Sequence, residues 1–284
     1  MKVGIVTFEK FHGRKTNSIG SSRIRAYNLV KYWEEASIYK HAKKYDVLIF
    51  QKAYWIEMAK KFEGIKILDL CDPDFLDWHY NIKEMADNCD AITCSTEALA
   101  NDVVRFVNCP VWMIPDREDI LGMKDRKIHI GPAKHAVWFG YAQNFPLLDS
   151  AVSHLYKYNL SLIVISNGIY VLPSFAEKKI DLINYKWTPE TADDDIKKGD
   201  IVLNPKSTNG IWKYKSNNKT LHAWNLGLPV VQFEDEINQF VSADNRKKEA
   251  ELRLAELKEK WDIEQSVEEY KNLIEEIKKD KNIG

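Results

Sequence analysis

Short apolar runs alternate along this chain with longer amphipathic stretches, and this alternation limits the fold more than any other feature. Several of the apolar runs are nearly continuous, as expected of parallel strands that are covered on both faces. We expect strands at residues 3–8, 46–50, 65–70, 91–94 and 111–114, and again at 136–139, 160–165, 180–184, 201–203 and 229–233. We expect helices at residues 22–35, 54–62, 78–88, 96–107, 145–158, 189–198 and 218–225. The pattern predicts an α/β fold with parallel sheets.

The series of strands is interrupted at residues 115–132, a charged stretch that ends in Gly131-Pro132. Such a composition is typical of a connection between domains. We therefore expect two Rossmann-like domains, residues 1–120 and 133–260, whose sheets face each other across a cleft that would bind the ligand. Residues 244–280 predict two helices separated near Trp261-Asp262. The second of these, within residues 261–284, is expected to pack back toward the first domain.

Charge and cysteine content exclude several classes of protein. The formal net charge of −1 argues against a protein that binds nucleic acid over its whole surface, although residues 1–31 hold seven Lys and Arg against Glu9 alone. None of the four cysteines forms a C-x-x-C pair, so we expect reduced thiols and no zinc site. No signal peptide opens the sequence, and no apolar run is long enough to span a membrane. We expect a cytoplasmic protein without stable membrane insertion.

The segment Lys215-Ser216-Asn217-Asn218-Lys219 precedes a short predicted helix that ends at Gly227. The first N–H groups of a helix have no partner within the helix and carry a partial positive charge, so this end suits an anion. The flanking lysines and asparagines favour a phosphate over a neutral ligand. The structural alternative is that Asn217 is an N-cap and the lysines are surface residues.

The order of these motifs resembles the GT-B class of nucleotide-sugar glycosyltransferases, which includes small phage enzymes. Residues 200–205 (D-I-V-L-N-P), 215–219 (K-S-N-N-K) and 227–231 (G-L-P-V-V) are similar to the donor domain of that class. Phe139-Gly140-Tyr141 is similar to the glycine turn that opens this domain, and residues 20–25 (G-S-S-R-I-R) look like the glycine loop of the acceptor domain. The resemblance covers the whole chain.

The resemblance implies a role for each of these motifs. The donor diphosphate would contact Gly140, Tyr141, Lys206, Lys215, Ser216, Asn217, Asn218 and Lys219. The donor nucleoside would contact Trp187 and His222. Many relatives carry an acid at the position of His222, and many carry Arg and Lys after the glycine turn, where this chain has Tyr141-Ala142-Gln143-Asn144. Lys206, Lys215 and Lys219 would supply the missing positive charge.

The first half supplies candidates for catalysis and acceptor binding. Asp72 and Asp74 follow the predicted strand at 65–70, at the end where open α/β sheets bind ligands, and either would serve as a catalytic carboxylate. The structural alternative is a loop acid and a turn cap. Gly20, Arg23 and Arg25 lie at a predicted helix start and would bind the acceptor. Solvent-exposed helix arginines are the alternative.

Together these features predict metal-independent transfer of a hexosyl or pentosyl group from a nucleotide-diphosphate sugar to an acceptor hydroxyl. Lysines and helix N–H groups would stabilise the leaving diphosphate, so no cofactor besides the sugar donor is expected. The acceptor would be either a cell-surface glycan or a hydroxymethylated base in duplex DNA. A non-catalytic module that binds nucleotides or nucleic acid, and a sugar-nucleotide epimerase, remain as alternatives.

Overall fold

The computed structural model describes residues 1–13, 19–77, 79–123, 125–177, 179–207 and 209–282. Contacts divide the chain into two compact units. Unit 1 comprises Met1–Asp119, Asn209–Ser216 and Asp262–Gly284, and unit 2 comprises Ile120–Thr208 and Asn217–Trp261. The segment Asn209–Ser216 therefore groups with unit 1, although we expected all of residues 133–260 in one domain.

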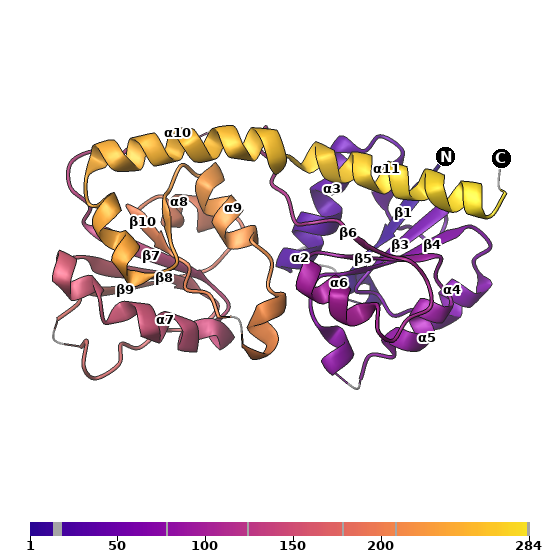
Figure 1. Cartoon of the computed structure of the whole chain (residues 1–284), viewed down its shortest axis with the longest axis horizontal. Helices are drawn as coiled ribbons and strands as arrows, with labels where there is room; N and C mark the ends of the chain where they lie inside the picture. The colour runs from indigo at the N-terminus through magenta and orange to yellow at the C-terminus, as the bar shows by residue number, and fades with distance from the viewer. Residues whose placement is uncertain (14–18, 78, 124, 178, 208, 283–284) are drawn as a thin grey trace. The chain divides into compact units, whose positions relative to one another are not determined.

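Unit 1 is built on six parallel strands in the order β2-β1-β3-β4-β5-β6 (Figure 1). Their bounds are β1 Val3–Val6, β2 Ala36–Ile38, β3 Val47–Gln51, β4 Ile65–Leu70, β5 Ala91–Cys94 and β6 Val111–Met113. Its helices are α1 Phe8–Phe11, α2 Gly20–Ser22, the π-helix η1 Arg23–Tyr27, α3 Leu29–Tyr32, α4 Ile56–Lys61, α5 Ile82–Asp87, α6 Glu97–Val103 and α11 Ile263–Asp280. Short 3₁₀ turns are η2 Asp74–Leu76 and η5 Gly210–Tyr214.

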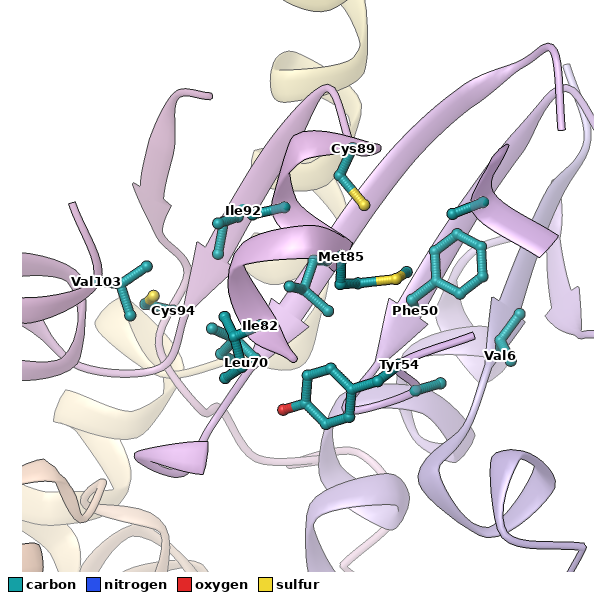
Figure 2. Close-up of a cluster of buried hydrophobic side chains, with 14 of the residues drawn as sticks. Val6, Phe50, Tyr54, Leu70, Ile82, Met85, Cys89, Ile92, Cys94 and Val103 are labelled. Atoms are coloured by element: carbon teal, nitrogen blue, oxygen red, sulfur yellow. The ribbon is translucent and has the colours of Figure 1, made fainter. Parts of the chain in front are cut away.

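Helices cover both faces of the unit 1 sheet, which explains why its strands read as continuous apolar runs. Successive side chains of a strand point to opposite faces. Thus Ile49 joins the cluster under α3 and α11, whereas Phe50 joins the cluster under α4, α5 and α6. Figure 2 shows the second cluster, in which Met85 of α5 packs among side chains of the strands.

Unit 2 holds five parallel strands in the order β11-β10-β7-β8-β9. Their bounds are β7 His135–Gly140, β8 Ser161–Ser166, β9 Leu182–Lys186, β10 Ile201–Leu203 and β11 Val230–Val231. Its helices are α7 Phe145–Val152, α8 Ala192–Ile196, α9 Asn218–Asn225 and α10 Ala243–Lys260, with 3₁₀ turns η3 Ala142–Asn144, η4 Leu155–Tyr158 and η6 Glu234–Phe240. One face of the sheet packs against α7, and the other packs against α8 and α9.

The α/β class with two parallel sheets is confirmed, although the local structure differs from the expectation in places. The strand expected at residues 3–8 ends at Val6, and Phe8–Phe11 forms the helix α1. The helix expected at residues 22–35 is broken by η1, because the N–H of Asn28 bonds the carbonyl of Arg23 at 2.8 Å, five residues back. The edge strand β2 was missed, because three half-buried residues are too few to show a period. The described residues also include no helix with the length and apolarity needed to cross a bilayer.

Candidate functional site

The first turn of α9 belongs to unit 2. Asn217 precedes this helix and is exposed, and its side chain makes no capping bond to the first-turn N–H groups. The Asn217 Oδ1 atom instead accepts a hydrogen bond from the Nζ atom of Lys206. Burial of that ammonium lowers the pKa of Lys206. Helix geometry leaves the first N–H groups without partners inside the helix, so this end keeps its capacity for an anion.

A glycine lets a lysine lie across the end of β7. Gly140 ends this strand with φ +153°, and a Cβ atom there would stand 2.5 Å from the Nζ atom of Lys219. The same ammonium lies 4.4 Å from the ring centroid of Trp138, at a distance typical of a cation–π contact. Lys219 belongs to the first turn of α9, so the ammonium and that turn lie on the same element. Tyr141 follows the glycine and is exposed.

The two candidate nucleoside residues border one apolar cluster of unit 2. The Nε2 atom of His222 lies 2.9 Å from the Oδ1 atom of Asp193 in α8, and the imidazole meets the Phe139 ring edge-on at 6.0 Å between centroids. Half-buried Trp187 packs against the cluster that contains Phe139, and its N–H bonds the carbonyl of Ser166 at the end of β8. The sequence analysis missed Asp193, because three consecutive acids resemble a solvated helix face.

In unit 1, the two candidate catalytic acids share a lysine. The Oδ2 atom of Asp72 lies 2.6 Å from the Nζ atom of Lys52, and its Oδ1 atom lies 2.8 Å from that of Lys215. Burial works to raise the pKa of Asp72, but the attraction of the two ammonium groups outweighs it and the pKa is lowered. Asp74 accepts a hydrogen bond of 2.5 Å from the Tyr54 hydroxyl and lies 3.4 Å from Lys52. Burial dominates there and raises the pKa of Asp74.

Lys52 is a site residue that the sequence analysis missed. It directly follows β3, so its position at the carboxyl end of a parallel strand was the available signal. Its backbone is left-handed, with φ +50°, which is uncommon for a residue other than glycine.

The structure disfavours the predicted acceptor contact of Arg25. This side chain is only 5% exposed, and its Nε and Nη2 atoms donate to Asp69. Its Nη1 atom donates to Asp116 at 2.8 Å. The pKa of Arg25 is raised, because the nearby carboxylates, Asp69 foremost, outweigh the burial that would lower it. The guanidinium is therefore part of the interior, unlike half-buried Arg23 in η1 and Gly20 in α2, which stay predictions.

The expected diphosphate residues fall into two environments. Gly140, Lys206, Asn217 and Lys219 belong to unit 2, together with Tyr141 and Asn218. Lys215 and Ser216 belong to unit 1, where both contact carboxylates: Lys215 pairs with Asp72, and the Ser216 hydroxyl donates to Asp116. The chain passes from unit 1 to unit 2 between Ser216 and Asn217, within the motif itself.

In the described part of the chain, no group of three or more His, Cys, Asp or Glu side chains is arranged to hold a metal ion. The four cysteines are free, and burial raises the pKa of Cys109 to about 11.

No family model matches this chain. No curated protein matches it either. Solved structures do match its fold. A crystal structure of Anabaena HepE with UDP aligns over 97% of this chain and 100% of its own, with a TM-score of 0.63 and 10% identity.

Two further solved structures align almost as fully. AviGT4, a glycosyltransferase involved in avilamycin A biosynthesis, covers 97% of both chains with a TM-score of 0.57 and 11% identity. The DNA-modifying enzyme β-glucosyltransferase covers 97% of this chain and 100% of its own, with a TM-score of 0.58 and 12% identity. A T4 phage structure of this kind holds UDP and Mn²⁺ (TM-score 0.54, 12% identity, 95% and 99% covered). These alignments confirm that the chain has the GT-B fold.

Proposed function

We propose that this protein is a glycosyltransferase that uses a nucleotide-diphosphate sugar. The observation that supports this most is the start of α9, where Lys219 crosses the side-chain-free end of β7 and no Asn217 side chain caps the first-turn N–H groups. Lys206 adds a second ammonium beside Asn217. The four solved structures of this fold described above include two with UDP and one studied with uridine diphosphoglucose.

The proposed chemistry follows from where charge develops. When the bond between the anomeric carbon and the diphosphate breaks, negative charge grows on the leaving oxygens. Fixed N–H dipoles and ammonium groups stabilise that charge without having to reorganise. Lys206 and Lys219 would take the part that a divalent cation takes in other transferases. We therefore propose that transfer requires no metal ion.

We propose a carbohydrate hydroxyl as the acceptor, in preference to a hydroxymethylated base in DNA. The case for DNA rested on the basic residues within positions 1–31. Two of these are now paired: Arg25 is buried between Asp69 and Asp116, and Lys31 lies 2.9 Å from Asp119. Their charges are offset inside the protein, so the surface offers fewer cations to a phosphate backbone.

The test is release of nucleotide diphosphate from a panel of UDP-, GDP- and TDP-sugars. Each donor is incubated with oligosaccharides, with hydroxymethylated duplex DNA or with no acceptor, and each reaction is repeated with EDTA. We expect release that depends on an oligosaccharide and persists in EDTA. Binding of UDP without release from any donor would instead support a non-catalytic module. Complete loss in EDTA, restored by Mn²⁺, would overturn metal independence while leaving the transferase proposal intact.

A further inference from the structure

The carboxyl edge of the unit 1 sheet holds buried polar atoms without partners. Among the described residues, Glu9 Oε2, Gln51 Nε2 and Ser95 Oγ are enclosed and make no hydrogen bond. Glu9 lies in α1 just after β1, Gln51 ends β3, and Ser95 follows β5. Buried polar groups in native proteins are nearly always bonded, because leaving one unsatisfied costs free energy. Three such atoms at strand ends of this sheet make this edge a candidate position for a polar ligand.

Hydrogen bonds from the protein fix which atom of Gln51 stays open. Its Oε1 atom accepts from the Ser22 hydroxyl at 2.7 Å and from the N–H of Phe8 at 3.3 Å. These two bonds orient the amide so that Nε2 is directed away from Ser22 and Phe8. The two carboxylate oxygens of Glu9 also differ in their hydrogen bonding. Its Oε1 atom accepts from the N–H of Ile19 at 3.3 Å, and its Oε2 atom is left without a partner.

Glu9 Oε2 is an acceptor without a donor, and Gln51 Nε2 is a donor without an acceptor. Together they complement a hydroxyl group. A hydroxyl donates its proton to one atom and accepts a hydrogen bond from another. Phe8, which bonds Gln51, directly precedes Glu9 in α1, so both residues belong to one corner of the sheet edge, where β1 and β3 are neighbours. The carboxylate at this corner is 1% exposed, which shields it from competing water.

The other carboxylates of this edge are already engaged. Both oxygens of Asp72 face lysines, and those lysines weaken it as a proton acceptor. Asp74 is bonded by the Tyr54 hydroxyl, and Asp69 is bonded by Arg25. Among these four carboxylates, Glu9 is the one with a buried oxygen that has no hydrogen-bond partner in the described part of the chain. A general base needs such a free oxygen toward the proton that it removes.

We propose that Glu9, in place of Asp72, is the base that removes the proton of the acceptor hydroxyl, while Gln51 Nε2 donates a hydrogen bond to the same hydroxyl oxygen. This inference rests on the proposed glycosyl transfer. The O–H bond breaks, its proton passes to Glu9 Oε2, and the oxygen forms a bond to the anomeric carbon. The bond from that carbon to the diphosphate breaks, and its electron pair leaves on the diphosphate. Direct displacement of this kind inverts the anomeric configuration.

Azide provides a test that does not depend on knowing the acceptor. At pH 7 azide is an anion that attacks carbon without losing a proton, so it needs no base. In the full-length protein, Glu9→Gln and Glu9→Ala should lower transfer to a hydroxyl acceptor by about 100-fold or more, the usual contribution of general-base catalysis. Azide-dependent release of nucleotide diphosphate should be at least as fast as in the wild type, because a repelling carboxylate has been removed. The sugar azide should have the inverted configuration.

Asp72→Asn is the control. Circular dichroism and thermal unfolding verify that each variant is folded, and UDP affinity by calorimetry verifies that the donor site is intact. In Asp72→Asn the hydroxyl and azide reactions should change by the same factor, because Asp72 removes no proton. Near-wild-type hydroxyl transfer by Glu9→Gln would overturn the inference, as would equal loss of both reactions in a variant that still binds UDP. A wild type that releases nothing from any donor, with hydroxyl or azide, would instead reject the proposed function itself.

Discussion

At the scale of single residues, the candidate donor site depends on the pairing of Gly140 with Lys219. The ammonium occupies the space where any other residue at position 140 would place its Cβ atom. The same ammonium lies 4.4 Å from the centroid of the Trp138 ring, at a distance typical of a cation–π contact. The lysine thus lies on the first turn of α9 and beside the end of β7.

Replacing Lys219 by alanine should weaken UDP binding by about tenfold or more, since a hydrogen bond to a charged group contributes about 1.5–3 kcal/mol. Calorimetric titration with UDP measures the change. Lys247→Ala is the matched control, because Lys247 is an exposed lysine of α10 that lies 3.8 Å from Asp244 of the same helix. Equal UDP affinity of the Lys219 variant and the control would reject this lysine as a diphosphate ligand.

His129 is a buried residue that makes the stability of unit 2 depend on pH. The Nε atom of Arg246 donates to His129 Nδ1 at 3.2 Å, so the proton of the neutral ring must sit on Nε2, which donates to the carbonyl of Gly227 at 2.8 Å. Burial is the main cause that lowers the pKa of His129, and Arg246 and Lys127 lower it further. The carbonyl of Gly227 and Asp200 act in the opposite direction.

The sign of the pH effect follows from this lowered pKa. In the unfolded chain the pKa of His129 is about 6.5, so below that pH the unfolded chain binds a proton that the folded protein does not. The stabilising contribution is therefore fully present above pH ~6.5, and it falls as the pH drops toward the folded pKa. We expect the Tm of the wild type to fall between pH 7.5 and 5.5 more steeply than that of His129→Phe, which starts lower but cannot titrate. Parallel slopes in thermal unfolding monitored by circular dichroism would contradict this prediction.

At the scale of elements, the segment Asn209–Ser216 is anchored in unit 1 although it lies between β10 and α9 of unit 2 in the sequence. Tyr214 of η5 is 4% exposed and meets Phe75 edge-on at 5.6 Å between ring centroids. Its hydroxyl donates to Asp102, and its carbonyl accepts a hydrogen bond from Thr96. This anchor fixes the backbone directly before Lys215 and Ser216.

Tyr214→Ala should destabilise unit 1 by about 3–5 kcal/mol, the usual cost of deleting a buried aromatic ring. Tyr214→Phe keeps the ring and loses only the bond to the Asp102 carboxylate, so about 1.5–3 kcal/mol is expected. Urea unfolding of the two variants and the wild type gives both values. An alanine variant as stable as the phenylalanine variant would show that the ring does not anchor the segment.

At the scale of the whole molecule, charge limits the choice of acceptor. The chain has a formal net charge of −1, and its basic N-terminal region contains the paired Arg25 and Lys31. Affinity for duplex DNA depends on how many phosphates a protein neutralises, and it falls with salt in proportion to that number.

We therefore expect a hydroxymethylated duplex to bind with a Kd weaker than about 10 μM at 150 mM salt, within the usual range of non-specific binding. Fluorescence anisotropy with a labelled oligonucleotide, over a series of salt concentrations, measures the affinity and its slope. An unlabelled oligosaccharide that shows turnover is the reference acceptor. Submicromolar binding with a steep salt dependence would favour DNA over a carbohydrate as the acceptor.

Local patterning was sufficient to predict much of the fold. Four elements match their expected bounds: β4, β5, β10 and α9. Their apolar patterns and the residues that end them are local in the sequence. The glycine and proline after α9 ended that helix where predicted. The start of α9 at Asn218 and the turn at Gly140 were also predicted, because helix starts and glycine turns have local chemical signatures.

Only the tertiary structure decided how these residues are grouped. The pairings of Lys219 with Gly140, of Lys52 with Asp72, and of Arg25 with Asp69 join positions far apart in the sequence. The unpaired oxygen of Glu9 is likewise visible only once its surroundings are known. Periodicity and composition predict the secondary structure and the burial of each residue from its neighbours along the chain. They do not report which distant side chain satisfies a charge, because that choice is made by the packing of the strands and helices.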